Sequence, residues 1–396
     1  MASSQSLTFK LNETMLKHTL LLLGLASSLV QAESSALATE GTLEAFLGEP
    51  ALTQQTLFND QRFPNVVVTT KGTVLVTWGS DGVRVRRSED GGKTWGDPIA
   101  LAKLGFQGGG TTVDETTGDI FAFVEDKHPP APLTVYRSSD DGKTWAAEKP
   151  TIHPDSKGNP PSMHMNDHGI TLRHGKHKGR LIRASRYYGK ENNRKEWPDH
   201  YTNAIYSDDH GKTWHTSDPF PENGTGEACI AELSDGRLYY NSRVHWQERP
   251  NNTRRREAWS SDGGKTWNDW RIIEILPDGP QDTNYGCMGG LVRLPVTGKD
   301  ILLYSNCESD SGRHHGTVWA SFDGGNTWPI KRLVTEGKFA YSSMTAGRPG
   351  TVSEGSVYLH YEGGPNGTAS TIARFNLAWV LKGIDTGDGS VPRKVD

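Results

Sequence analysis

The sequence predicts an all-β protein folded as a six-bladed β-propeller with four-stranded antiparallel blades. The main observation is a repeat, because one octapeptide pattern occurs five times with starts 50, 69, 53 and 61 residues apart. Repeats at such periods predict propeller blades or solenoid units. The composition agrees, since 45 glycines and 12 tryptophans among 396 residues suit short strands joined by tight turns.

The octapeptide, Ser-x-Asp-x-Gly-x-Thr-Trp, predicts a hairpin turn between two strands of one blade. Its Asp accepts backbone N–H bonds and its Gly takes a positive φ. A β-rich run precedes each copy, as in Leu133–Arg137. The five Asp residues are therefore expected to be turn residues rather than catalytic carboxylates. The copies are Ser88–Trp95, Ser138–Trp145, Ser207–Trp214, Ser260–Trp267 and Ser321–Trp328.

Five copies predict a six-bladed ring in which one blade lacks the octapeptide. Residues 45–385, divided among six blades, give about 57 residues for each, which is enough for four short strands and their loops. Runs such as 65–69, 72–77 and 301–304 have the composition of strands.

The N-terminus carries the one long apolar stretch. Thr19–Val30 is rich in leucine, follows Lys17 and precedes Ala32, which completes a small-residue cleavage site. This predicts a secretory signal peptide and an exported protein without any further membrane span; a buried helix or a membrane anchor is the alternative. The predicted organisation is a signal peptide with an upstream extension (1–32), a linker (33–44), the propeller (45–385) and a loose tail (386–396).

Charge and cysteine content exclude several function classes. The formal net charge is −4 and the chain has no long basic run, so no nucleic-acid partner is expected. The short run Arg254–Arg256 is interpreted as a solvated strand edge or a local salt-bridge partner. Three cysteines, Cys229, Cys287 and Cys307, are too few for a disulfide framework, and their spacing matches no metal motif. No cofactor is expected.

The octapeptide resembles the Asp-box, or BNR repeat, of the sialidase (neuraminidase) family. Its five copies cover most of the chain. The resemblance implies a glycoside hydrolase, an exo-α-sialidase that releases terminal sialic acid, or a close nonulosonic acid, from a sialylated glycan. Asp-boxes also occur in non-catalytic propellers and in unrelated hydrolases, so the function depends on the site residues.

Three arginines are predicted to bind the sugar carboxylate. A guanidinium bonds a carboxylate bidentately and stays charged at any working pH, and the resemblance implies three of them from three blades. Arg62, within Gln61–Pro64, resembles the family's Arg-Ile-Pro signature with Phe in place of Ile. Arg243 ends a predicted hairpin that starts at Glu227, like the family's glutamate-and-arginine hairpin. Arg313, before the fifth octapeptide, resembles the third arginine.

Tyr341 is the predicted nucleophile and Glu227 its base. The segment Ala340–Ser342 resembles the family's Ala-Tyr-Ser segment. A neutral phenol avoids the repulsion that the substrate carboxylate would exert on an anionic nucleophile, and Glu227 can take the phenol proton. The resemblance therefore implies a double displacement with retention.

Asp81 is the predicted general acid/base. The family places an Asp on a loop between the first arginine and the first Asp-box, and Asp81 is the one carboxylate in the short equivalent stretch here. The alternative interpretation is an ordinary turn residue in Ser-Asp-Gly. In that case another residue supplies the proton, or the activity is altered.

Asp167 and His168 are further predicted substrate contacts. They lie in His164–Ile170, which resembles the family's His-Gly-Ile-Gln segment with Thr171 in place of Gln. They could contact sugar hydroxyls or substitute for the short loop. A metal site is disfavoured, because strand spacing would place His164 and Asp167 on opposite faces.

Two rival functions stay open. One is a hydrolase or lyase for another acidic sugar, which would use the arginines but not Tyr341 in the same way. The other is a non-catalytic carbohydrate-binding propeller, which would explain the short stretch around Asp81 but has little use for a Glu227–Tyr341 pair. Hydrolysis of a fluorogenic sialoside discriminates between these functions.

Overall fold

The computed structural model describes residues 39–382, except residues 190, 192, 246–252, 283–285 and 365, together with Met1 and Ile384. Apart from Met1, the predicted signal peptide lies outside the described residues, as do residues 33–38 of the predicted linker and the predicted tail. Those boundaries stay predictions. The sheets belong to one compact unit, Ala38–Asp396.

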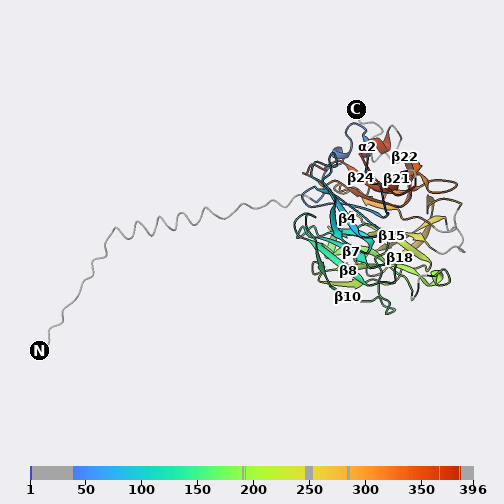
Figure 1. Cartoon of the computed structure of the whole chain (residues 1–396). Coiled ribbons are helices and arrows are strands. Elements are labelled where there is room, and N and C mark those ends of the chain that lie inside the picture. Colours follow the sequence, from blue (N-terminus) through green and yellow to red (C-terminus); the bar gives the residue numbers. More distant parts are fainter. Residues whose placement is uncertain are drawn as a thin grey trace. The chain divides into compact units, whose positions relative to one another are not determined.

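Sheets follow one another along the chain, each made mainly of consecutive antiparallel strands (Figure 1). The third sheet differs from the prediction in having a fifth strand, because β10 pairs in parallel with β14. The first three sheets contain β2 (Pro64–Val68), β3 (Val74–Trp78), β4 (Val83–Ser88) and β5 (Ile99–Ala102); β6 (Phe106–Val113), β7 (Ile120–Glu125), β8 (Leu133–Ser138) and β9 (Ala146–Glu148); and β10 (Thr151–Ile152), β11 (Ile170–Thr171), β12 (Leu181–Tyr187), β13 (Tyr201–Ser207) and β14 (Thr213–Thr216).

The sixth sheet joins both ends of the propeller. β1 pairs antiparallel with β25, with Leu52 opposite Phe375, so an early strand completes a sheet of late strands (Figure 1). The last three sheets contain β15 (Thr225–Glu232), β16 (Leu238–Val244), β17 (Arg254–Ser260) and β18 (Asn268–Pro277); β19 (Gly290–Arg293), β20 (Leu302–Cys307), β21 (His314–Ser321) and β22 (Ile330–Lys338); and β23 (Ser342–Ala346), β24 (Val357–Gly363), β25 (Ala369–Phe375) and β1 (Leu52–Phe58).

The inner strands form a closed ring. β2 contacts β6, β6 contacts β11 and β12, β12 contacts β15, β15 contacts β19, β19 contacts β23, and β23 contacts β2. Clusters of buried apolar side chains fill the space between neighbouring sheets. The predicted six-bladed β-propeller is therefore confirmed.

Helical segments are short and lie outside the sheets. Each 3-10 helix covers a single turn, and α2 follows β25 with Asn376 as its N-cap, whose side chain accepts from the Trp379 backbone. In the part of the chain that the structure describes, no helix is long and apolar enough to cross a membrane. The helical segments are η1 (Glu44–Phe46), η2 (Gly175–His177), η3 (Trp197–Asp199) and α2 (Leu377–Leu381).

Each octapeptide forms the turn between the last two strands of its sheet in chain order. Its Ser hydroxyl donates to its Asp carboxylate at 2.7–2.9 Å in all five copies. The Ser oxygen accepts the N–H of the Gly that all five copies share, and the φ of this Gly lies between 78° and 93°. The turn is therefore closed by local bonds, as the sequence predicted, and the sixth sheet is the one without it.

One sequence interpretation is wrong. Arg255 and Arg256 lie on β17 and are almost fully buried, so this run is no solvated strand edge. Arg255 pairs with Asp278 at 2.7 Å and Arg256 with Glu222 at 3.0 Å. The salt-bridge alternative is the correct one, because a buried guanidinium requires a counter-charge.

Candidate active site

The proposed chemical groups gather where the inner strands begin. Arg62 lies two residues before β2, and Tyr341 directly precedes β23. Glu227 lies on β15 at a β-bulge between Thr225 and Ala228, where two residues have no partner on β16. A bulge re-aims a side chain away from the regular pleat, and here it brings Glu227 to the same end of the ring as Tyr341 and Arg62.

Tyr341, Glu227 and Arg243 form a buried hydrogen-bonded triangle. The Tyr341 hydroxyl donates to Glu227 Oε1 at 2.8 Å, and Arg243 Nη1 donates to the Tyr341 oxygen at 2.9 Å. Arg243 also pairs with the Glu227 carboxylate. All three side chains are less than a tenth exposed. The predicted hairpin partnership of Glu227 and Arg243 is thus present, and Tyr341 joins it from another blade.

The triangle sets the protonation states. Burial and the nearby Glu227 carboxylate raise the pKa of Tyr341 well above its usual range, so the phenol is neutral at rest. Burial alone would raise the pKa of Glu227, but the charges of Arg243 and Arg186 and two hydrogen bonds lower it. Glu227 is therefore an anion whose carboxylate accepts the hydrogen bond of the Tyr341 hydroxyl. A base paired with a hydroxyl in this way can activate it as a nucleophile.

The three predicted arginines surround the Tyr341 ring. The guanidinium carbons of Arg62, Arg313 and Arg243 lie 5.0, 5.1 and 6.0 Å from the ring centroid. They come from three different blades, as predicted. Three guanidinium groups thus face one phenol, and two of them are paired, Arg243 with Glu227 and Arg62 with Glu362.

Glu362, at the end of β24, is a site residue that the sequence analysis missed. Its carboxylate binds Arg62 in a fork, with Nε–Oε1 at 3.0 Å and Nη2–Oε2 at 2.8 Å. It also accepts the backbone N–H of Phe63, whose φ of 80° is left-handed. Glu362 thus fixes the whole Arg62–Phe63 turn. A glutamate inside the otherwise strand-like run Val357–Gly363 was the signal that could have revealed it.

Replacing Glu362 with Gln should weaken substrate binding more than chemistry. The amide keeps the size but loses the charge that orients Arg62, so we expect KM for a sialoside to rise about 10-fold to 100-fold with a smaller loss of kcat. Steady-state kinetics measure this split, with the exposed Glu336→Gln as the control. An unchanged KM would contradict the orienting role.

Asp81 lies on a turn that is hydrogen-bonded to the Arg62 segment, where Gly79 N–H donates to the Arg62 carbonyl at 3.0 Å. It sits on the connection between β3 and β4, and its side chain is exposed. Gln61 holds its backbone, accepting from the Asp81 N–H and donating to its C=O, both at 3.1 Å. Among the described residues, no hydrogen bond or ion pair joins the Asp81 carboxylate to Tyr341 or Glu227. Its role as acid/base stays a prediction.

Asp167 and His168 lie inside the ring rather than at the triangle. The Asp167 carboxylate accepts the Ser343 hydroxyl, the His168 N–H at 2.8 Å and the Leu291 N–H at 2.9 Å. These bonds tie three blades together, and the Asp167 side chain is fully buried. The geometry favours a structural role for Asp167, and substrate contact by either residue stays a prediction.

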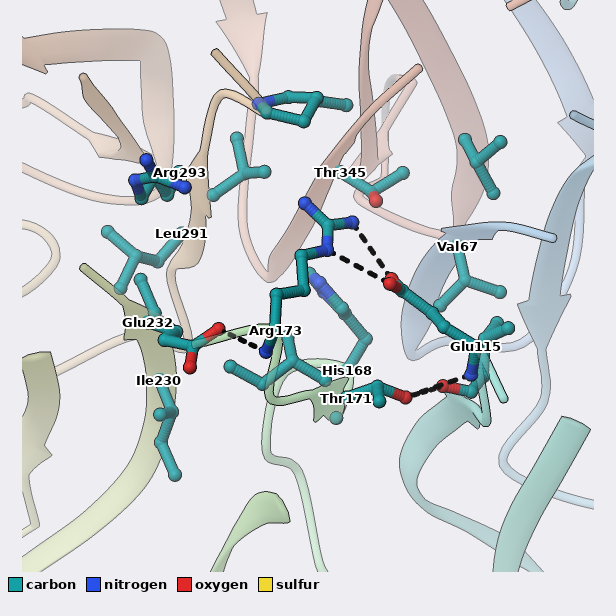
Figure 2. A pocket seen from close by; sticks show the side chains of 18 of the residues that line it. Val67, Glu115, His168, Thr171, Arg173, Ile230, Glu232, Leu291, Arg293 and Thr345 are labelled. Atoms are coloured by element: carbon teal, nitrogen blue, oxygen red, sulfur yellow. Dashed lines mark hydrogen bonds and ion pairs between the residues drawn. The ribbon is translucent and has the colours of Figure 1, made fainter. Parts of the chain in front are cut away.

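A cavity of about 90 Å³ occupies the opposite end of the inner strands, and His168 lines it. Figure 2 shows the Arg173 guanidinium turned toward Glu115, with Nη2–Oε1 at 2.8 Å, and Glu232 bonded to the Arg173 backbone. Burial alone would raise the pKa of Glu115, but the charges of Arg173 and Arg348 lower it to about 2. Glu115 is therefore an anion held between the Arg173 and Arg348 guanidinium groups.

Glu125, the last residue of β7, anchors the segment that leads to His164. Its Oε1 accepts the Ser162 hydroxyl at 2.6 Å and the Met163 N–H at 3.1 Å, whereas its Oε2 has no partner. Burial raises the pKa of Glu125 to about 7. The carboxyl is thus protonated in the folded protein at mildly acidic pH.

This raised pKa predicts a pH-dependent stability. Because the folded pKa lies above the unfolded value, the contribution is fully present below about pH 4 and is lost as the pH rises through about 7, a difference on the order of 3–4 kcal/mol. We expect Glu125→Gln to flatten this part of the unfolding free energy against pH, measured by urea unfolding at several pH values. The control Glu336→Gln should keep the slope, and a slope kept by Glu125→Gln would contradict the assignment.

No candidate metal centre accompanies these groups. Within the described ranges, no set of three or more His, Cys, Asp or Glu side chains is arranged to hold a metal ion. The three cysteines are buried free thiols.

Comparison with known proteins places this geometry in a family. The profile of the BNR repeat-like domain family matches residues 79–353. The chain belongs to the family of BNR repeat-like domains. A sialidase of Micromonospora viridifaciens is 31% identical over 400 residues, covering 90% of this chain and 58% of that protein. A sialidase of Bacteroides fragilis is 28% identical over 338 residues, covering 72% of this chain and 57% of that protein.

A solved structure agrees with these relatives. A Hadza microbial sialidase is 25% identical and superposes with a TM-score of 0.62 over 81% of this chain and 66% of that chain. The predicted membership of the sialidase family with Asp-box repeats is therefore confirmed. The chain spans a little more than half the length of its two curated relatives.

Proposed function

We propose that this chain is a retaining exo-α-sialidase that hydrolyses terminal sialic acid, or a close nonulosonic acid, from sialylated glycans. The observation that carries the proposal is the buried triangle of Tyr341, Glu227 and Arg243 inside three arginines. Sialidases use a tyrosine nucleophile instead of a second carboxylate. The two curated relatives, both sialidases, support the same activity.

In the proposed reaction the arginines hold the sugar carboxylate against Tyr341. The Tyr341 oxygen bonds to the anomeric carbon as the bond from that carbon to the aglycone oxygen breaks and the aglycone leaves, and the Tyr341 proton passes to Glu227 Oε1, 2.8 Å away. The charge of Arg243, 2.9 Å from the same oxygen, stabilises the phenolate that develops. Water then hydrolyses the glycosyl–tyrosine intermediate, so the two displacements retain the anomeric configuration.

Export is part of this proposal. The leucine-rich run Thr19–Val30 and the cleavage site at Ala32 support a signal peptide. Extracellular or periplasmic glycans would then be the substrates, and no nucleic-acid partner is expected.

A non-catalytic carbohydrate-binding propeller is the second candidate. The observation that favours it is the exposed position of Asp81 on a short turn, where, among the described residues, its carboxylate makes no hydrogen bond or ion pair to the triangle. Such a protein would still use the three arginines to bind an acidic sugar.

Turnover of sialosides tests the two candidates. We expect hydrolysis of a 4-methylumbelliferyl α-sialoside, followed by fluorescence, and of 3′-sialyllactose, with the α-anomer of the free sugar appearing first by proton NMR. Glycan binding without turnover of either compound would support the binding propeller instead. Initial release of the β-anomer would contradict retention.

A further inference from the structure

The connection between β3 and β4, where the acid/base was predicted, is a short turn. β3 ends at Trp78 and β4 begins at Val83, so four residues connect them. Four residues reach at most about 14 Å when extended, and these fold back as a turn in which Gly82 has a φ of 76°. The side chain of Gln61 clamps the Asp81 backbone in this turn. Another connection is therefore a candidate source of the proton.

A histidine pair, His128 and His164, lies beside the nucleophile. His128 is in the connection from β7 to β8, and His164 precedes β11. Their ring centroids are 4.4 Å apart. The His164 ring lies 6.3 Å from Phe63, whose ring lies 6.0 Å from Tyr341. Phe63 thus lies between His164 and Tyr341, and His128 is in contact with His164.

The two histidines have different surroundings. His164 is buried, and its Nδ1 has no hydrogen-bond partner. Burial and the charges of His128, Arg186, Arg243 and Arg62 hold its pKa well below the usual range, so His164 stays neutral. Because His164 stays neutral, His128 is the member of the pair that takes up and releases a proton.

His128 has the geometry of a proton donor. Its side chain is exposed, and its Nδ1 lies 3.1 Å from the Pro129 carbonyl oxygen, which fixes Nδ1 as a donor. Its Nε2 lies 3.4 Å from the Tyr188 hydroxyl. Nε2 is therefore the nitrogen that gains or loses the proton. An exposed imidazole can also reach both a leaving oxygen and an incoming water.

The charges that face His128 link it to the triangle. Partial burial lowers the pKa of His128 and the hydrogen bond to the Pro129 carbonyl raises it, whereas the charge of Arg186 on β12 lowers it and the Glu227 carboxylate on β15 raises it. The same carboxylate acts on Tyr188. His128 is thus in electrostatic contact with the base of the proposed reaction, although the two come from different blades.

We propose that His128, rather than Asp81, is the general acid/base of this site. The proposal rests on the proposed sialidase function. His128 Nε2–H gives its proton to the glycosidic oxygen as the bond from that oxygen to the anomeric carbon breaks. The Tyr341 oxygen bonds to that carbon at the same time and gives its own proton to Glu227. Neutral His128 then takes a proton from water as the water oxygen bonds to the anomeric carbon, and Tyr341 leaves and recovers its proton from Glu227.

Leaving-group dependence tests this proposal. The nitrophenolate of an aryl sialoside such as 4-nitrophenyl sialoside leaves without being protonated, whereas the lactose of 3′-sialyllactose must be protonated as it leaves. For His128→Gln we expect kcat/KM for 3′-sialyllactose to fall about 10²-fold to 10⁴-fold, and for the aryl sialoside about 10-fold or less. A sugar adduct on Tyr341 should accumulate with the aryl substrate and be visible by intact-protein mass spectrometry, because the base for hydrolysis is also lost. For the wild-type protein with 3′-sialyllactose, kcat/KM should fall as the pH rises through the His128 pKa. With the aryl substrate this fall should be absent.

Two further variants make the outcomes distinct. His153→Gln is the matched control, because His153 stacks on His215 at the outer strands of the third sheet. Asp81→Asn is the competing variant. Equal losses on both substrates for His128→Gln would overturn the proposal, as would a leaving-group split produced by Asp81→Asn and not by His128→Gln. Absence of wild-type turnover on both substrates would instead refute the proposed function.

Discussion

Replacing Tyr341 with phenylalanine is expected to lower kcat for any sialoside by on the order of 10³-fold or more, the size of loss seen when a nucleophile is removed from a coupled nucleophile–base pair. The substitution deletes the oxygen that donates to Glu227 at 2.8 Å and accepts from Arg243 at 2.9 Å. The ring remains, so its packing against Arg62 and Phe63 is preserved. Sugar binding should therefore survive while the covalent step is lost.

Kinetics and binding measured together check this expectation. Initial rates with a fluorogenic sialoside give kcat, and calorimetric titration with 3′-sialyllactose gives the affinity of the inactive variant. Tyr136→Phe, on β8 and away from the triangle, is the matched control. A Tyr341→Phe variant that retained more than a tenth of wild-type kcat would exclude Tyr341 as the nucleophile.

Replacing Asp278 with asparagine is expected to destabilise the fold by about 3–5 kcal/mol, the usual cost of breaking one partner of a buried ion pair. Asp278 and Arg255 are both fully buried and meet at 2.7 Å. Asparagine would leave the Arg255 charge inside the protein with neutral partners only, the Asn241 side chain and the Cys287 carbonyl. The substitution should also disturb the position of Arg243 in the candidate active site, because Asp278 accepts the N–H of the neighbouring residue Val244.

Urea unfolding measures this effect against an exposed pair. The Arg237–Asp235 pair has the same chemistry at 2.7 Å, but both side chains are half exposed. Asp235→Asn should therefore cost about 1 kcal/mol or less. Similar costs for the two asparagine variants would contradict the importance of the buried pair.

Local chemistry explains why the fold was predictable. The octapeptide closes its own turn, because Ser88, Asp90 and Gly92 bond one another within five residues. Each copy therefore carries its structure with it, and five copies define five blades. The sixth blade and the parallel β10 were not visible in this way, since their pairing partners lie far along the chain.

The site was only partly predictable. Glu227 and Arg243 share one hairpin, so a short range of sequence placed them together. Glu362 was missed because its partner Arg62 lies 300 residues away. The sequence suggested substrate contact for Asp167, but the structure engages its carboxylate with Ser343, 176 residues away.

By itself, the sequence determined the repeated turn, the blade count and the residue types that can bind a carboxylate and attack an anomeric carbon. These features depend on bonds between near neighbours in the chain. Only the tertiary structure decided that Tyr341 donates to Glu227, that Glu362 orients Arg62, and that His128 stands beside His164 while Asp81 stays on an exposed turn. Ring closure brings these side chains together from separate blades, and no local periodicity encodes which blade faces which.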